Sequence, residues 1–289
     1  MVYANERPII KDEELLEEAR LMDALGTGMT GGDPLLQLDR TLHYAAVLKS
    51  EFPDHHIHLY TAAADDPVLN RLEGLIDEIR VHLINFSDIS VVKKALNYTF
   101  DVGVEIPMFP SRVKETQDLI HRLKEVGIHF INLNELEYAD RNIQYLKKSG
   151  YTLDLNSCRV LESEEAALEL ANKEEIVHYC SARDKDAVQL KNRLTRRARN
   201  VRKPYEEIED GLLVKGVIFC RTHKEAQDIR KVLLGKVDIP PDLVAVVSTR
   251  VETHWALAEE ASSWIKAKIG IEKRYPTFDQ PLIEYIPVT

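Results

Sequence analysis

The sequence predicts an α/β fold in which a parallel sheet is followed by a smaller α+β domain. Three observations support this prediction. Segments with helical spacing of apolar residues alternate with short apolar segments, the alternation repeats about every 25 residues, and the pattern changes near residue 150. Strands that alternate with helices at this spacing form right-handed βαβ units, whose strands lie parallel.

The first 150 residues contain the regular part of the pattern. Helices are expected at residues 11–25, 38–49, 67–76, 87–98, 111–126 and 140–148. The fourth helix begins at a serine or aspartate cap, and Gly127 and Gly150 end the last two. Strands are expected in the glycine-rich segment after residue 25 and at residues 55–62, 79–85, 101–107 and 128–133. These strands read as apolar on both faces, which is typical of a buried parallel sheet.

The second part of the chain is less regular, and its elements suggest a mixed βαβαβ unit. Helices are expected at residues 164–171, 185–201, 224–234 and 254–269. Strands are expected as a pair within 151–160 and at residues 175–180, 212–219 and 243–249, with an edge strand at 282–286. We therefore predict two domains, residues 1–150 and residues 151–289.

Composition limits the class of protein. Of the 289 residues, 44% are hydrophobic and 30% are charged, and no apolar run approaches the roughly 20 residues of a membrane span. The first residues do not form a secretory signal, and three cysteines are too few for a disulfide framework, so a reducing, cytoplasmic location is expected. The net charge of −10 argues against a surface that binds nucleic acid throughout, but it allows a local basic patch.

The most informative segment is the glycine-rich run from Gly26 to Pro34, which ends in Gly31-Gly32-Asp33-Pro34. Glycine lets a ligand approach the main chain closely and tolerates positive φ angles. A strand-to-helix turn that needs glycine only for its geometry, or a phosphate-binding loop, would explain the same residues.

The Gly31-Gly32-Asp33-Pro34 run resembles the GGEP motif of the radical S-adenosylmethionine (SAM) superfamily, with aspartate in place of glutamate. In that superfamily the motif binds the amino group of SAM. Residues 2–8, 24–35, 55–61 and 178–181 resemble an uncharacterised archaeal-type group related to pyruvate formate-lyase activating enzyme. The resemblance implies a partial (β/α) barrel, similar to a TIM barrel, that lacks its first strand in this chain.

The resemblance also implies two cofactors, SAM and a [4Fe-4S] cluster held by a CxxxCxxC motif. The chain contains no such motif, so we expect it to be incomplete at its N-terminus and inactive by itself. The full-length protein is expected to cleave SAM reductively and to abstract hydrogen from an unknown substrate, with ferredoxin or flavodoxin as electron donor. The glycine-rich strand is expected to lie at an exposed sheet edge.

Ligands of parallel α/β sheets bind at the carboxyl ends of the strands. The cofactor-binding residues predicted there are Gly31, Gly32, Asp33, Pro34, Tyr60, Thr61, Asn85, Ser87, Glu105, Asn132 and Asn134. Helix capping would also explain Ser87, and a turn would explain Asn132 and Asn134. Glu105 is a single acid in an apolar strand, and a buried acid needs a partner. No metal ligands and no catalytic residues are assigned.

Two other functions remain open. His56 and His58 lie on one face of a strand, as in metal-dependent barrel hydrolases, and His82 on the next strand is the nearest further histidine. Residues 183–203 are rich in arginine and lysine, and they could bind RNA in a protein without a cluster. A solvated helix whose cations pair with acids is the more common structure for such a segment. Cys180 could be a functional thiol or a buried cysteine.

Overall fold

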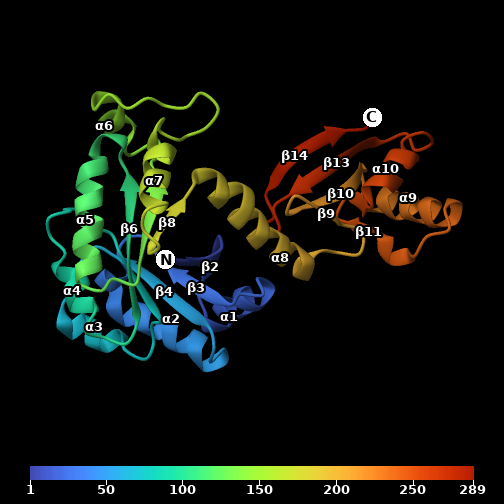
Figure 1. The fold of residues 1–289 in the computed structure, drawn as a ribbon. Helices are drawn as coiled ribbons and strands as arrows, with labels where there is room; N and C mark the ends of the chain where they lie inside the picture. Colours follow the sequence, from blue (N-terminus) through green and yellow to red (C-terminus); the bar gives the residue numbers. More distant parts are fainter. The chain divides into compact units, whose positions relative to one another are not determined.

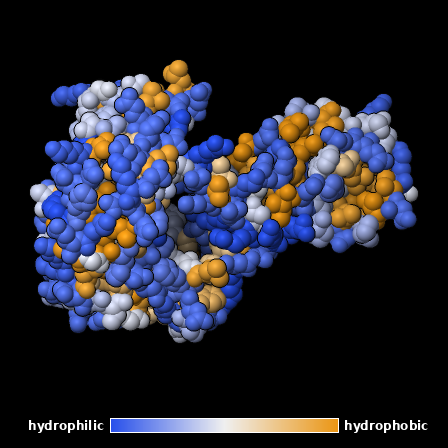
Figure 2. Space-filling view, viewed as in Figure 1, coloured by the Kyte–Doolittle hydropathy of each residue, from blue (hydrophilic) through white to orange (hydrophobic). Residues whose placement is uncertain are grey.

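The computed structural model describes the backbone of residues 1–289 and every side chain except that of Asp186. The chain divides into two compact units. Ala24–Val188 form one, which we call the parallel-sheet unit, and Met1–Asp23 together with Gln189–Thr289 form the other, the antiparallel-sheet unit. No described helix combines the length and apolar character that crossing a membrane requires. The face seen in Figure 2 is largely hydrophilic.

The parallel-sheet unit contains six strands in the order β3-β4-β5-β6-β7-β8, and every neighbouring pair is parallel. The strands are β3 (Gly26–Met29), β4 (His56–Thr61), β5 (Glu78–Val81), β6 (Asp101–Met108), β7 (Phe130–Glu135) and β8 (Val177–Cys180). The connecting helices are η1 (Pro34–Gln37), α2 (Leu38–Glu51), α3 (Asp66–Leu72), α4 (Ser90–Ala95), η2 (Pro110–Arg112), α5 (Val113–Glu125), α6 (Ile143–Lys148) and α7 (Ser163–Ala171). The predicted parallel α/β sheet is confirmed, and β3 lies at its edge, as expected.

The two faces of this sheet differ, which the sequence analysis did not predict. One face is apolar and fully buried, with Ile57, Leu59, Ile79 and Val81 at 0% exposure. Helices α2 to α5 connect the strands of this unit (Figure 1). Buried residues of these helices, such as Leu48 of α2, belong to the same core. The alternate residues point to the other face and are mostly polar. The expectation of strands apolar on both faces is therefore wrong, because charged and aromatic side chains alternate with the aliphatic ones.

Glycine 103 has a packing role on the polar face. It is the register partner of Phe130, and a Cβ atom added at Gly103 would lie 2.1 Å from Phe130 Cζ. We expect Gly103→Ala to lower the free energy of unfolding by about 1–3 kcal/mol, because the ring would have to leave its position. Urea unfolding followed by far-UV circular dichroism measures the loss. A Phe130→Leu background should recover most of it, and an equal loss in both backgrounds would contradict this packing explanation.

The antiparallel-sheet unit is built around strands in the order β11-β12-β10-β13-β14, with β9 also paired to β10. These strands are β9 (Glu207–Glu209), β10 (Leu212–Phe219), β11 (Val244–Val247), β12 (Arg250–Thr253), β13 (Lys268–Arg274) and β14 (Leu282–Pro287). The unit also contains the hairpin β1 (Val2–Ala4) and β2 (Arg7–Ile9), and helices α1 (Asp12–Leu21), α8 (Lys191–Val201), α9 (His223–Lys236), η4 (Pro241–Leu243) and α10 (Trp255–Ala261). A π-helical segment, η3 (Asp184–Leu190), precedes α8.

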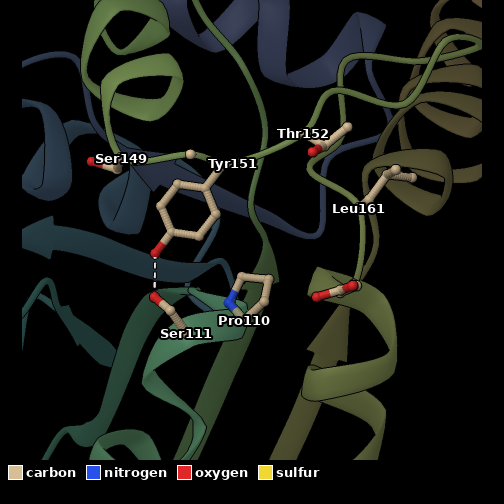
Figure 3. Close-up of a pocket in the computed structure, with 8 residues that line it drawn as sticks. Pro110, Ser111, Ser149, Tyr151, Thr152 and Leu161 are labelled. Carbon is tan, nitrogen blue, oxygen red and sulfur yellow. Dashed lines mark hydrogen bonds between the residues drawn. The ribbon is translucent and has the colours of Figure 1, made fainter.

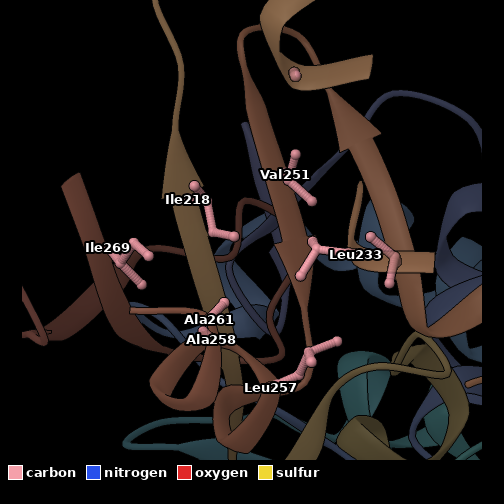
Figure 4. Packing of buried hydrophobic residues seen from close by; sticks show 9 residues of the cluster. Ile218, Leu233, Val251, Leu257, Ala258, Ala261 and Ile269 are labelled. Atoms are coloured by element: carbon pink, nitrogen blue, oxygen red, sulfur yellow. The ribbon is translucent and has the colours of Figure 1, made fainter. Parts of the chain in front are cut away.

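A hydrophobic core joins α9 and α10 to one face of the antiparallel sheet. Ile218, Val251 and Ile269 contribute from the strands, and Leu233 and Ala258 contribute from the helices (Figure 4). All five side chains are at 0% exposure. The predicted α+β character of this part is consistent with the structure, but its strand pairs are antiparallel instead of forming a βαβαβ unit.

The division of the chain differs from the predicted boundary at residue 150. Strand β8 pairs with β7, so the parallel sheet extends beyond residue 150. Met1–Asp23, by contrast, belong to the unit that contains the C-terminus. Both differences depend on contacts between residues far apart in sequence. A local apolar pattern does not report such contacts.

Candidate functional site

Two exposed glycines with positive φ angles follow the end of β3. Gly31 and Gly32 have φ angles of +92° and +80°, and a Cβ atom at either position would meet no heavy atom within 4 Å. Both glycines are exposed. This part of the main chain is therefore open to a ligand, and its conformation favours glycine.

Asp33 connects this segment to the neighbouring strand. Its Oδ1 accepts a hydrogen bond from the Leu35 amide at 3.0 Å, and Pro34 begins helix η1. Its Oδ2 lies 2.8 Å from the Thr61 hydroxyl and accepts a bond from the Ala62 amide at 2.9 Å. These three bonds leave one acceptor position free on Oδ1, since a carboxylate offers about four. Asp33 thus brings Thr61 and the two glycines to one place.

The strand register collects polar side chains on one face of the parallel sheet. Gly28, His58 and Glu78 are successive register partners, as are Tyr60 and Arg80 on β4 and β5. Residues two apart in a strand share a face. The polar face, as we name it, therefore carries His56, His58, Tyr60, Glu78, Arg80, His82, Glu105, Asn132, Asn134, His178 and Cys180.

Arg80 lies at the centre of a hydrogen-bonded network on this polar face. Its Nε donates to Glu78 Oε1, and its Nη1 donates to the Tyr60 hydroxyl at 3.0 Å. The same Nη1 lies 3.6 Å from Glu105 Oε2. Asn134 Nδ2 donates to Glu105 Oε1 at 2.9 Å. Three predicted site residues, Tyr60, Glu105 and Asn134, are thereby brought together.

Two acceptors in this network accept no hydrogen bond within the described part of the chain, although one of them, Glu105 Oε2, forms the ion pair with Arg80. Glu105 Oε2 and Asn134 Oδ1 are buried and accept no hydrogen bond from the described residues. Buried polar atoms are usually satisfied, and each exception calls for an explanation. A donor group of a bound molecule would satisfy both atoms.

Burial changes the acid–base behaviour of the polar face. Burial, followed by the charge of Arg80, lowers the pKa of His58 to about 4, so this imidazole is neutral at neutral pH. Burial, followed by the charge of Glu105, raises the pKa of Tyr60. Burial and then Glu105 also raise the pKa of the Cys180 thiol, which is therefore protonated and a weak nucleophile.

Comparison with known proteins identifies the family. The chain is 38% identical over 251 residues to a protein of Methanocaldococcus jannaschii that carries the provisional name of a glycyl-radical enzyme activating enzyme. The match covers 81% of this chain and 67% of the relative. This chain belongs to that radical SAM family. Residues 211–288 of this chain also match a family described only as a domain of unknown function, DUF8061.

The cysteines of this family member do not fit a cluster site. A [4Fe-4S] cluster of the kind the family implies requires several thiolates at one place. Cys158 lies in a loop, Cys180 ends β8, and Cys220 belongs to the antiparallel-sheet unit. Among the described residues, the single cluster of potential metal ligands is His56, His58 and Glu78, which contains no cysteine. The three described cysteines therefore do not form such a site.

The remaining predicted residues are not part of the polar network. Asn85 and Ser87 lie in the exposed loop after β5, where Asn85 Oδ1 accepts bonds from the Ser87 amide and hydroxyl. Asp88 accepts a bond from the Ser90 amide, but the N-cap residue of α4 is Ile89 and no side chain caps the helix, so the predicted serine or aspartate cap is wrong. Asn132 is buried on the polar face, beside Glu105 in the register.

The sequence analysis did not identify Glu78 and Arg80, which connect the other polar residues. A signal was present, because Glu78 and Arg80 alternate with Ile79 and Val81 at the period of a strand with one polar face. The shortness of β5, only four residues, makes this alternation easy to miss.

A separate pocket lies beyond the end of β6. It has a volume of about 340 Å³, and its lining residues are Pro110, Ser111, Ser149, Gly150, Tyr151, Thr152, Leu161 and Glu162 (Figure 3). The Ser111 and Tyr151 hydroxyls are hydrogen-bonded across it. None of the predicted site residues lines this pocket.

The basic segment 183–203 is only partly available to a nucleic acid. Arg197 is buried and forms an ion pair with Glu18, while Lys185 pairs with Glu137 and Lys191 with Asp210. This agrees with the interpretation of a helix whose cations pair with acids. It weakens the RNA hypothesis, because several cations of the segment, including the buried Arg197, already pair with acids.

Proposed function

We propose that this chain supplies the SAM-binding part of a radical SAM activating enzyme. The open backbone at Gly31 and Gly32, next to Asp33, is the observation that supports this proposal most directly. Their carbonyl groups and the free lone pair of Asp33 Oδ1 would accept hydrogen bonds from the ammonium of SAM, which has three donors. The parallel sheet would then be part of a (β/α) barrel that opens toward its polar face.

We further propose that Glu105, Asn134 and Tyr60 face the reacting molecule. The acceptors of Glu105 and Asn134 that receive no hydrogen bond from the described residues support this role, because they require donors. The name of the relative points to a glycyl-radical enzyme as the substrate class, and an electron donor such as ferredoxin or flavodoxin would act with the cluster. The cysteine ligands of that cluster are not supplied by this chain. A cytoplasmic location is part of the same proposal.

The test is SAM binding by the purified 289-residue chain, measured by saturation-transfer difference NMR, which detects weak ligands. We expect a signal from SAM that S-adenosylhomocysteine displaces. Asp33→Ala is expected to weaken binding about 10–100-fold, because it removes a charge-assisted hydrogen bond. Asp140→Ala, which changes an exposed acid of the same unit, is the matched control and should bind normally.

Circular dichroism of both variants verifies that they are folded. Asp33 also connects η1 to the end of β4, so Asp33→Asn, which retains one acceptor oxygen, is a second variant. It should be better folded than Asp33→Ala but still bind SAM more weakly than the unmodified chain. Equal SAM binding by the unmodified chain and both Asp33 variants would contradict this site.

A further inference from the structure

A second cluster of polar side chains lies at the opposite ends of the strands from Gly31 and Asp33. His56 begins β4, His58 follows two residues later on the same face, and Glu78 begins β5 as the register partner of His58. One potential ligand atom of each lies within 4.8 Å of those of the other two. Because β4 and β5 are hydrogen-bonded to each other in one sheet, this convergence is fixed by their register.

The spacing suits a small metal ion. His56 Nε2 and Glu78 Oε2 are 3.5 Å apart. In a tetrahedral zinc site, with bonds of about 2.0–2.1 Å, neighbouring ligand atoms lie about 3.3 Å apart. One pair is thus already near this spacing, and all three ligand atoms lie within 4.8 Å of one another, so they would have to move closer together to surround one ion.

The local charge also suits a cation. Arg80 binds Oε1 of Glu78 and lies 3.6 Å from Glu105, so one guanidinium faces two carboxylates. This group carries a net charge of −1 when all three are ionised. The bond from Arg80 also holds the Glu78 carboxylate with Oε2 toward His56, and such outer contacts commonly orient metal ligands.

Strand β3 makes room for the His58 ring, and the exposed side of the cluster is that of His56. Gly28, beside His58 in the register, has no side chain, and a Cβ atom there would lie 2.6 Å from His58 Nε2. The His58 ring thus occupies space that only glycine provides. The side chain of His56 is 47% exposed and that of Glu78 is 13% exposed, so an ion could enter from the side of His56.

We propose that His56, His58 and Glu78 bind one divalent transition-metal ion of the zinc class. Two imidazoles and a carboxylate are a ligand set that Zn²⁺ prefers, and three protein ligands leave a fourth position for water. The site is separate from the proposed SAM site, because it lies at the amino-terminal ends of β4 and β5. It does not depend on whether the chain binds SAM.

The experiment uses the 289-residue chain after treatment with EDTA and removal of the chelator. Isothermal titration with Zn²⁺ measures the stoichiometry, and the visible absorption of bound Co²⁺ reports the coordination geometry. We expect one ion per chain with tetrahedral Co²⁺ absorption. The double variant His56→Gln/His58→Gln should bind at least about 100-fold more weakly. His82→Gln removes a histidine of the same face outside the cluster and should bind normally.

A second variant separates ligand loss from misfolding. Glu78→Gln retains the shape of the side chain and should weaken Zn²⁺ binding about 10–100-fold. Zn²⁺ should also raise the melting temperature of the unmodified chain and of His82→Gln but not that of Glu78→Gln. The proposal is overturned if the chain binds no ion at one equivalent, or if the folded Glu78→Gln variant binds Zn²⁺ as the unmodified chain does.

Discussion

Replacing Arg197 by methionine is expected to lower the free energy of unfolding of the antiparallel-sheet unit by about 3–5 kcal/mol. Arg197 donates to Glu18 through Nε at 2.7 Å and Nη2 at 2.9 Å, and Nη1 donates to the Pro276 carbonyl. The two side chains are 4% and 1% exposed. Without Arg197, the Glu18 carboxylate would remain buried with only a 3.4 Å bond from Asn5. The loss of stability is large because an ionised carboxylate would be buried without a charged partner.

Tryptophan fluorescence during urea unfolding measures this loss. Both tryptophans of the chain, Trp255 and Trp264, belong to the antiparallel-sheet unit, so the signal reports that unit alone. Arg196→Met, at an exposed neighbouring position, should change stability by less than about 0.5 kcal/mol. A double variant Glu18→Leu/Arg197→Met should be more stable than Arg197→Met alone, because no charge is left unpaired. A loss below 1 kcal/mol in Arg197→Met would contradict this explanation.

Replacing Lys215 by methionine is expected to have a comparable effect, about 3–5 kcal/mol at neutral pH. Lys215 lies between two buried carboxylates, 2.9 Å from Glu252 Oε2 and 3.5 Å from Glu206 Oε1. The side chains of Lys215, Glu206 and Glu252 are at most 4% exposed. The Tyr205 hydroxyl also donates to Glu252 at 2.8 Å. Methionine would leave the buried Glu206 carboxylate without this cation, and Glu252 would keep only the more exposed cations of Arg250 and Lys203.

The same group predicts a dependence on pH. Burial by itself raises the pKa of Glu252, but the bond and charge of Lys215, together with the Tyr205 hydrogen bond and the charge of Arg250, outweigh it and hold this pKa below its ordinary value of 4.5. The ionised pair therefore stabilises the fold above about pH 4.5, and this contribution is lost as the pH falls through the folded-state pKa. The difference in stability between the unmodified chain and Lys215→Met should accordingly shrink in acid.

Urea unfolding between neutral pH and pH 3, again followed by tryptophan fluorescence, measures both effects. The matched control is Lys273→Met, whose cation pairs with the half-exposed carboxylates of Glu209 and Glu284. Exposed pairs contribute little, so this variant should lose less than about 1 kcal/mol. A difference between Lys215→Met and the unmodified chain that does not change with pH would contradict the assignment of the stabilisation to ionised Glu252.

The local pattern of apolar residues was sufficient to predict most strands of the parallel-sheet unit. The expected strands at 55–62, 101–107 and 128–133 correspond to β4, β6 and β7, because each is a short segment between helices in which aliphatic residues recur at every second position. The expected helix at 254–269 was wrong in its second half. Helix α10 ends at Ala261, and Lys268–Arg274 form β13, whose buried Ile269 and Ile271 have the two-residue spacing of a strand.

The hairpin of β11 and β12 was not predicted, because its turn lacks the usual turn residues. The two strands are joined without glycine, and Ser248 instead adopts a positive φ of 55°. Because glycine, asparagine and aspartate are the usual residues of such turns, the sequence gives little indication of a chain reversal here. A single strand at 243–249 was predicted in place of two.

The βα repeat, the glycine run before Asp33 and the resemblance to radical SAM proteins are visible in the sequence, because these features depend on residues that are neighbours along the chain. The division of the chain into two units and the contacts between distant side chains depend instead on tertiary structure. Arg197 and Glu18 are 179 residues apart, and the network of Tyr60, Arg80 and Glu105 exists only because three strands pair in one register. Such contacts arise from the pairing of distant segments, which the local spacing of residues does not specify.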